Sequence, residues 1–209
     1  MQMTRRDFAV MAGAAAMTGP AFAQTGAPLV TRAIPSSGEL LPAVGLGTAQ
    51  VFNTADDVTR QKAAAVVQAL IANGGRLIDT ASTYRDAEVV LGDVIVSAGL
   101  REKLFIATKT EAPDIAEFKR SLARLKTAKV DLLQLHNVSD TQQSLARFKE
   151  WKSQGLCRYI GITSTFHDDF TAVEAVLKRD PSFADAMHRA DALRARGGHP
   201  TPPPDNDDL

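Results

Sequence analysis

Short apolar segments alternate with longer amphipathic segments through the middle of this 209-residue chain. The apolar segments contain few polar residues, which is typical of strands that are buried on both faces of a parallel sheet. The amphipathic segments repeat apolar residues every three or four positions, which indicates helices packed against that sheet. The pattern repeats five times, and the predicted strands are 43–48, 76–81, 104–109, 130–136 and 158–163.

A predicted helix follows each of these strands, and several helices have boundary signals. The first ends at Gly74 and Gly75, the third begins after the capping residue Asp114, and the fourth opens with Asp140 and Gln143 as a capping box. The first helix should present one apolar face, formed by Val66, Val67, Leu70 and Ile71. The predicted helices are 58–75, 87–99, 114–126, 140–155 and 168–181.

The segment before this alternation, residues 29–42, predicts two short strands around a turn at Pro35–Gly38. The five strand–helix units that follow fit either a (β/α)₈ barrel or an open, doubly wound sheet. No GxGxxG or Walker-type loop follows any of the strands, which weakens the nucleotide-binding form of the second alternative.

The first 23 residues have the pattern of an export signal. Arg5 and Arg6 precede a mild apolar run over 9–17, and Ala21-Phe22-Ala23 forms an A-x-A cleavage pattern. This resembles a twin-arginine signal, which implies the twin-arginine export machinery as a partner and a periplasmic location. The alternative is an uncleaved membrane anchor, but the run is too short to span a bilayer of about 30 Å, so we expect no stable membrane span.

Composition and charge exclude several kinds of partner. The chain has 24 basic and 24 acidic residues and no basic stripe, so we expect no nucleic-acid partner. Its one cysteine, Cys157, cannot form an intrachain disulfide and is interpreted as a small structural residue. His188 and His199 lack metal-ligand spacing, and we predict no metal site.

Ionisable side chains end three consecutive predicted strands. These are Asp79, Lys109 and His136, and Tyr84 follows Asp79 closely in the next loop. Singly, they could be a turn cap, a solvated strand end, a core histidine and a packing residue. In a parallel barrel, however, the carboxyl ends of all strands open on one face, where barrel enzymes carry their chemistry. We therefore expect the four side chains to converge.

The stretch around these residues, DTASTYRDAE, resembles the DTA-x-x-YG-x-AE signature of the aldo/keto reductases. The segments LPAVGLGT, IATK, DLLQLHN and RYIGITS agree, and the resemblance runs from about residue 29 to 183. It implies an α/β fold of the (β/α)₈ TIM-barrel type. It also implies NADPH as the cofactor, with NADH not excluded, and a small carbonyl substrate, an aldehyde or ketone reduced to the alcohol.

By matching motif positions, the catalytic tetrad of that family falls on Asp79, Tyr84, Lys109 and His136. The residue types fit the reaction. A hydride moves from the nicotinamide to the carbonyl carbon, and Tyr84 would deliver the proton to the oxygen. Lys109 would favour the phenolate, Asp79 would hold Lys109 charged and oriented, and His136 would orient the carbonyl by a hydrogen bond.

Two positions depart from the family pattern. Arg85 replaces the glycine after the tyrosine, so we expect a shifted loop. Thr163 and Ser164 stand where many relatives have a Ser-Asn pair on the nicotinamide carboxamide, and with Asp79 they are the candidate cofactor-binding residues. Glu88 is expected to make a structural hydrogen bond and Trp151 to be a packing residue.

The resemblance ends where the composition changes, after Phe183. The expected organisation is a signal peptide over 1–23, a partial barrel of about five βα units with an N-terminal β-hairpin over 24–183, and an irregular, disordered tail over 184–209.

A barrel truncated in this way would leave strand edges open, which predicts self-association and weak or absent NADPH binding. Another reading frame after residue 183 is expected to encode the missing strands. Two alternatives to an active reductase therefore stay open: a non-catalytic remnant, and a partial barrel that serves as a binding or assembly module.

Overall fold

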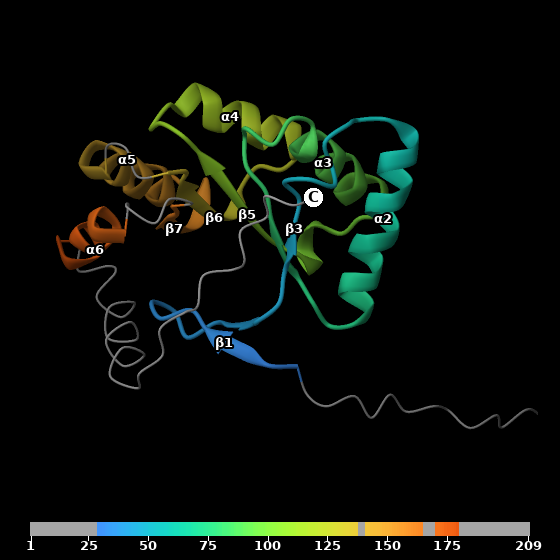
Figure 1. The fold of residues 1–209 in the computed structure, drawn as a ribbon, viewed down its shortest axis with the longest axis horizontal. Coiled ribbons are helices and arrows are strands. Elements are labelled where there is room, and N and C mark those ends of the chain that lie inside the picture. The colour runs from blue at the N-terminus through green and yellow to red at the C-terminus, as the bar shows by residue number, and fades with distance from the viewer. Residues whose placement is uncertain (1–28, 138–140, 165–169, 180–209) are drawn as a thin grey trace, which may run out of the picture.

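The computed structural model describes residues 29–137, 141–164 and 170–179 (Figure 1). The predicted signal peptide over 1–23, the Asp140 cap, the helix end at Pro181 and the tail over 184–209 lie outside these residues.

The element order follows the predicted alternation. A hairpin comes first, with antiparallel strands β1 (Thr31–Ala33) and β2 (Leu40–Pro42), which confirms the expected hairpin. The later strands are β3 (Leu46–Gly47), β4 (Leu77–Asp79), β5 (Phe105–Thr110), β6 (Val130–Leu135) and β7 (Cys157–Ile162). The helices are α2 (Asp57–Ala72), α3 (Ala87–Ser97), α4 (Ile115–Arg124), α5 (Thr141–Ser153) and α6 (Phe170–Arg179), with a short 3₁₀ helix η1 (Arg101–Lys103).

The strands β3 to β7 form one parallel sheet in sequential order. A doubly wound sheet reverses its strand order at a switch point, whereas a barrel adds each strand beside the previous one. In Figure 1 the helices α2 to α6 follow one another around the outside of the sheet, and the hairpin lies below it. The topology is therefore that of a partial (β/α)₈ barrel and not of the doubly wound alternative.

The core lies between the sheet and the helices. Ile78 of β4, Ile106 of β5 and Leu133 of β6 are fully buried there and join one cluster with side chains of α2 to α5. Trp151 stacks on Phe118 with ring centroids 5.4 Å apart, which confirms its packing role.

The expected apolar face of α2 is partly wrong. Val67 is fully buried together with Ala63, whereas Val66 is 44% exposed. The helix buries the narrow stripe that contains residues four apart, and Val66 lies about 100° around the helix from Val67, beyond that stripe. The small side chain of Ala63 lies in the buried stripe of α2, which is narrower than the predicted apolar face.

A buried carboxylate ties three elements together behind the sheet. Glu88 of α3 is 1% exposed and accepts hydrogen bonds from Thr108 (2.6 Å), Ser121 (2.9 Å) and Arg124 (2.7 Å). Three donors satisfy a charge that would otherwise be costly to bury. Glu88 is therefore a structural residue, as predicted. Next to it, a Cβ at Gly92 would lie 2.1 Å from the Arg124 carbonyl oxygen, so the close approach of α3 and α4 requires glycine.

The hairpin is fixed to the amino-terminal edge of the sheet by what we call the hairpin clamp: Glu39, Arg76, Arg158 and Tyr159. The Glu39 carboxylate accepts hydrogen bonds from Arg76 (3.0 Å), from Arg158 and from the Tyr159 hydroxyl (2.8 Å). Burial opposes ionisation of Glu39, but the bonds from Tyr159 and Arg158 outweigh it and hold its pKa below the ordinary value. Arg158 also pairs with Asp131 (2.9 Å), so the clamp continues into β6.

Candidate active site

The parallel register brings the predicted site residues to one edge of the sheet. Asp79 ends β4, and Lys109 lies one residue before the end of β5, opposite Gln134 of β6. The backbone N–H of His136 donates to the carbonyl oxygen of Thr110 (2.8 Å), which extends the pairing of β5 and β6 by one residue and fixes the imidazole beside Lys109. The carboxyl ends of three neighbouring strands thus supply an acid, an amine and an imidazole.

Lys109 is the centre of the cluster. Its ammonium, on a residue only 6% exposed, forms an ion pair with Asp79 and donates to the carbonyl oxygen of Thr80 (2.9 Å). Its Nζ lies 3.5 Å from the Tyr84 hydroxyl oxygen. A buried ammonium is stable only when its donors are used, so these partners explain why a buried strand ends in a carboxylate.

Tyr84 packs against both of its neighbours in the cluster. The Lys109 Nζ lies 4.9 Å from the centroid of its ring, and the His136 ring meets it edge-on with centroids 5.8 Å apart. The loop that carries Tyr84 is anchored to β5, because the Ser82 N–H donates to the carbonyl oxygen of Lys109 (3.0 Å). The structure therefore brings Asp79, Tyr84, Lys109 and His136 together.

Arg85 follows Tyr84 in a left-handed backbone conformation with φ +46°, which glycine adopts more readily than a residue with a side chain. The backbone at Arg85 is therefore strained, and Tyr84 lies beside Lys109. The expected shift of this loop relative to the family stays a prediction.

His136 is nearly buried, at 9% exposure. Burial and the nearby charge of Lys109 lower its pKa, and the carboxylates of Glu111 and Asp79 only partly oppose this. The imidazole is therefore neutral at neutral pH. Its Nδ1 lies 3.4 Å from the Thr83 hydroxyl oxygen, which the sequence did not single out.

Gln134 is a second residue that sequence reasoning missed. Its Nε2 lies 3.4 Å from Asp79 Oδ1, whereas Lys109 pairs with the other carboxylate oxygen, Oδ2. A signal was available, because Gln134 is the one uncharged polar residue within the otherwise apolar core of the predicted strand 130–136.

The candidate cofactor-binding residues Thr163 and Ser164 lie just beyond β7, at the same edge but separated from Asp79 by β5 and β6. The Thr163 N–H donates to the carbonyl oxygen of Leu135 (2.9 Å), and its hydroxyl lies 3.5 Å from the same oxygen. The two residues thus continue the row of polar groups along the carboxyl edge, two strands away from Asp79.

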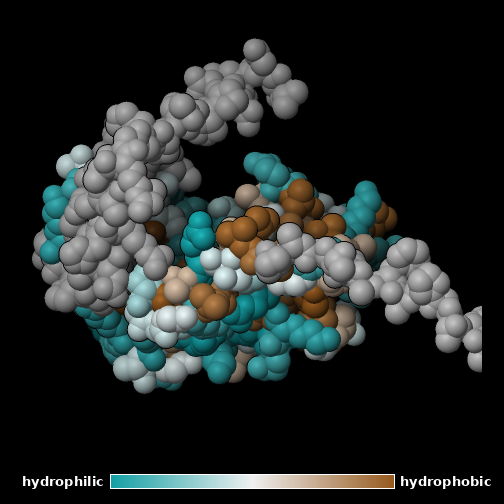
Figure 2. Space-filling model, turned by 90° about the horizontal axis from the view of Figure 1, so that it is seen from below, coloured by the Kyte–Doolittle hydropathy of each residue, from teal (hydrophilic) through white to brown (hydrophobic). Residues whose placement is uncertain are grey.

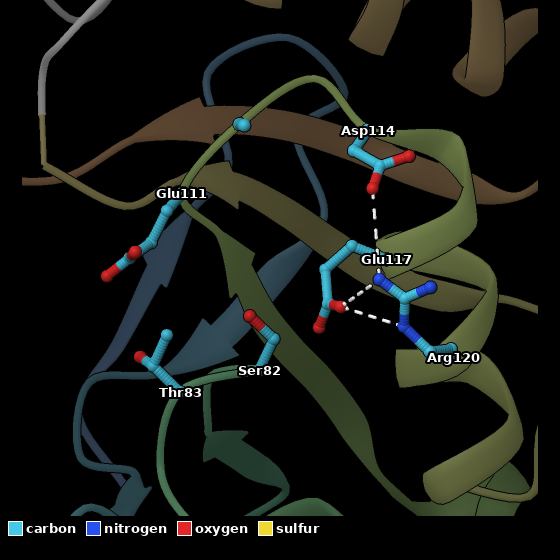
Figure 3. Close-up of a pocket in the computed structure, with 7 residues that line it drawn as sticks. Ser82, Thr83, Glu111, Asp114, Glu117 and Arg120 are labelled. Carbon is cyan, nitrogen blue, oxygen red and sulfur yellow. Dashed lines mark hydrogen bonds and ion pairs between the residues drawn. The ribbon is translucent and has the colours of Figure 1, made fainter.

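A hollow of about 330 Å³ opens beside the cluster, between the loop after β4 and the start of α4. Figure 3 shows Arg120 turned toward Glu117 and Asp114, while Glu111 stands apart from them and the Ser82 and Thr83 side chains approach from the other loop. The lining side chains are polar or charged except for Ala112, and Arg120 and Glu117 form an ion pair at 2.7 Å.

Sheet topology and converging strand ends together define the chain as a protein of the (β/α)-barrel class. Residues 43–186 match the sequence model of the aldo/keto reductase family. The match covers more than half of the chain, and the chain belongs to this family.

Curated relatives agree with the family. The chain is 34% identical over 136 residues to a methylglyoxal reductase DkgB of Salmonella typhi, across 59% of this chain and 48% of that protein. It is 32% identical over 139 residues to a glyoxal reductase of Bacillus subtilis, across 61% of this chain and 47% of that protein. The chain therefore spans about half the length of the curated relatives it matches.

Solved structures agree with the fold. An aldo-keto reductase from Klebsiella pneumoniae in complex with NADPH superposes with a TM-score of 0.62 at 27% identity, across 75% of this chain and 56% of that one. This similarity confirms the α/β architecture of TIM-barrel type that the resemblance implied.

Proposed function

We propose that the site reduces aldehydes or ketones to alcohols, with NADPH as the hydride donor. One observation carries the proposal: the Lys109 ammonium lies between the Asp79 carboxylate and the Tyr84 hydroxyl at the carboxyl edge of the sheet. The names of the relatives, glyoxal and methylglyoxal reductases, support a small reactive dicarbonyl as the substrate class. The relative crystallised with NADPH supports the cofactor.

The described residues fit the nicotinamide end of that cofactor. A carboxamide needs both a donor and an acceptor, and Gln134, Asp79, Thr163 and Ser164 offer both at the carboxyl edge. Gly161 leaves space beside the Gln134 side chain, because a Cβ at position 161 would lie 3.3 Å from Gln134 Cγ. No site for the phosphates is identified within the described ranges 29–137, 141–164 and 170–179.

The chain's own residues would then control the proton. When bound, the reduced nicotinamide supplies a hydride to the carbonyl carbon. Tyr84 gives its proton to the carbonyl oxygen, and the resulting phenolate is stabilised by the ammonium of Lys109, 3.5 Å away. Asp79 pairs with the ammonium of Lys109 and holds it beside the Tyr84 hydroxyl.

His136 has a different part in the mechanism. A neutral imidazole can donate one hydrogen bond, and the low pKa caused by burial and by Lys109 keeps the ring neutral. A donor fixed in a nearly buried position stabilises the charge that develops on a carbonyl oxygen. We therefore assign His136 to orienting and polarising the substrate, and Tyr84 to transferring the proton.

The direct test is a titration of the purified chain with NADPH, followed by nicotinamide fluorescence, and then addition of methylglyoxal. The proposal predicts saturable binding and consumption of NADPH at 340 nm. A parallel titration with NADH separates the two cofactors. If neither cofactor binds, the reductase proposal fails for this chain and the non-catalytic remnant is favoured.

A second function, an assembly module, is supported by the open edges of the sheet. Within the described residues, β3 pairs only with β4 and β7 pairs only with β6. Hydrophobic residues also gather on the face shown in Figure 2. Leu29, Val30 and Val44 line an apolar groove together with residues of α2. Open edges and apolar surface promote association between chains. Light scattering would show a defined oligomer if this function holds, and a monomer would contradict it.

We also propose that the protein is exported to the periplasm by the twin-arginine route. The support is the sequence of the first 23 residues, with Arg5, Arg6 and the A-x-A pattern. Among the described residues, no helix is long and apolar enough to span a membrane. Replacing both arginines by lysine keeps the charge, and the protein should then stay uncleaved in the cytoplasm. A mature form starting near Gln24 in the periplasm of this variant would contradict the proposal.

A further inference from the structure

Thr83 stands at the junction between the reactive cluster and the hollow beside it. It belongs to the loop that follows β4, between Asp79 and Tyr84, and its side chain lines the hollow (Figure 3). Its hydroxyl oxygen is 3.4 Å from Nδ1 of His136. In the signature of the family this position is unspecified, so motif matching gives it no role.

The contact matters because His136 is neutral. A neutral imidazole carries one proton on two nitrogens, and only the nitrogen that carries it can donate a hydrogen bond. Within the described residues, Thr83 is the one hydrogen-bond partner of the ring through Nδ1, and Nε2 has none there. The group that meets Nδ1 therefore decides whether Nε2 can donate to a substrate oxygen.

We infer that Thr83 is a positioning residue that donates its hydroxyl proton to Nδ1 and so keeps the imidazole proton on Nε2. This inference rests on the proposed carbonyl reduction, because it explains how His136 is made a donor. A hydroxyl can give or accept a hydrogen bond, but accepting from Nδ1 would leave Nε2 with a bare lone pair facing the lone pairs of a carbonyl oxygen.

The backbone holds Thr83 in place for this role. On one side the Ser82 N–H donates to the Lys109 carbonyl oxygen (3.0 Å), and on the other the Tyr84 N–H donates to the Ala81 carbonyl oxygen (3.2 Å). The loop is thereby tied both to β5 and to itself, so the hydroxyl is presented to the ring by a rigid turn.

Charges around the ring do not replace this contact. The charge of Lys109 disfavours the imidazolium, while Glu111 and Asp79 favour it, and these three act on the ring through charge, whereas Thr83 contacts Nδ1 directly. They therefore set how much of the ring is protonated, whereas the Thr83 hydroxyl sets which nitrogen holds the proton of the neutral form.

A matched pair of variants tests the inference. Thr83→Val keeps the shape and removes the hydroxyl, and Thr83→Ser keeps the hydroxyl. Ring ¹⁵N chemical shifts of His136, among the four histidines of the chain, would be assigned with the variant His136→Gln. We expect the Nε2–H form in the native protein and in the serine variant, and a mixture of both tautomers in the valine variant at pH 7.5.

Turnover gives a second readout. The valine variant should lower kcat by about 3- to 10-fold, the effect of one lost hydrogen bond between neutral groups, with the NADPH dissociation constant unchanged and with rescue by serine. An identical tautomer in all three proteins would overturn the inference whatever the activity. A tautomer change in a protein that reduces no carbonyl would instead support the contact and contradict the proposed reaction, so the two failures are distinguishable.

Discussion

The two edges of the sheet carry the same kinds of side chain in different roles, one structural and the other at the candidate active site. At the amino-terminal edge, the hairpin clamp joins a carboxylate, two guanidinium groups and a phenol through bonds of 3.0 Å or less. At the carboxyl edge, Asp79, Lys109, Tyr84 and His136 also combine a carboxylate, a cation and a phenol. There the Tyr84 hydroxyl oxygen is 3.5 Å from Lys109 Nζ, and His136 Nδ1 is 3.4 Å from the Thr83 hydroxyl oxygen.

The difference lies in how completely the polar groups are used. In the clamp, Tyr159 bonds to Glu39 and lies 2.8 Å from the Ser37 hydroxyl, so its phenol is fully occupied by the protein. Tyr84 has one long contact, and its oxygen keeps the capacity to bond a ligand. Fully satisfied polar networks stabilise a fold, whereas groups held in place but incompletely bonded are available for chemistry.

The largest effect should follow from Lys109→Met. We expect turnover to fall by about 100-fold or more, the range for losing a component of acid catalysis. The free energy of unfolding should change by less than about 1 kcal/mol, because the Asp79 side chain is 40% exposed and can be solvated when its partner is gone. Steady-state kinetics and urea unfolding would check this, with the exposed Lys103→Met as the control. Loss of folding without a specific loss of turnover would assign Lys109 to stability.

The opposite result is expected at the clamp. Glu39→Gln removes the charge that Arg76 and Arg158 share, and should lower the free energy of unfolding by about 2 kcal/mol, the range for hydrogen bonds to charged groups. Turnover per folded molecule should stay unchanged, because the clamp lies at the far edge of the sheet. The exposed Glu102→Gln is a matched control. A clamp variant that keeps full stability would show that the hairpin is held by apolar contacts alone.

The pH dependence of stability should separate the two edges. The folded-state pKa of His136 lies below the ordinary value of about 6.5, so between the two values the unfolded chain binds more protons than the folded one. The contribution of His136 to stability is therefore complete above about pH 6.5 and is lost as the pH falls below it.

The contribution of Glu39 should be lost in a more acidic range. Its folded-state pKa is also lowered, so its stabilisation is present above the ordinary carboxylate value of about 4.3 and is lost as the pH falls through the folded-state value. Melting temperatures of the native protein, His136→Gln and Glu39→Gln from pH 3.5 to 8 would check both windows. If His136→Gln and the native protein lose stability equally as the pH falls below about 6.5, the proposed histidine window is contradicted.

The smallest effect concerns the strained turn after Tyr84. Arg85→Gly should raise the free energy of unfolding by about 0.5–1 kcal/mol, because relief of the left-handed backbone outweighs the extra chain entropy of glycine. Arg85→Ala keeps a Cβ and should give no such gain. Equal stability of the glycine and alanine variants in urea unfolding would contradict a strained turn.

Much of the fold could be predicted from the sequence because it depends on local pattern. The apolar runs predict the five strands of the parallel sheet. Asp114 is predicted to cap a helix, and its side chain accepts a hydrogen bond from the Ala116 N–H at the start of α4. The burial of Val66 was predicted wrongly because helical periodicity alone does not show how wide the buried stripe is. The hairpin clamp could not be predicted, since Glu39 and Arg158 are 119 residues apart and no local pattern links them.

The same reason explains what was found and missed at the carboxyl edge. Asp79, Lys109 and His136 were visible because each ends a predicted strand, and a parallel sheet brings strand ends together. Thr83 and Gln134 were missed because their contacts, with His136 and Asp79, depend on loop geometry and side-chain direction. A family signature finds positions that the family shares, and position 83 is not one of them.

The chain has two tyrosines, one at each edge, and they allow the most direct test of the difference between the edges. Each is replaced by phenylalanine, and both turnover of methylglyoxal with NADPH and the free energy of unfolding are measured on both proteins. We predict that Tyr84→Phe lowers turnover by about 100-fold or more with little change in stability. We predict that Tyr159→Phe lowers stability by about 1.5 kcal/mol, the value of one hydrogen bond to a charged group, with turnover intact. Near-normal turnover in Tyr84→Phe, or an equal loss of turnover in both variants, would contradict the account.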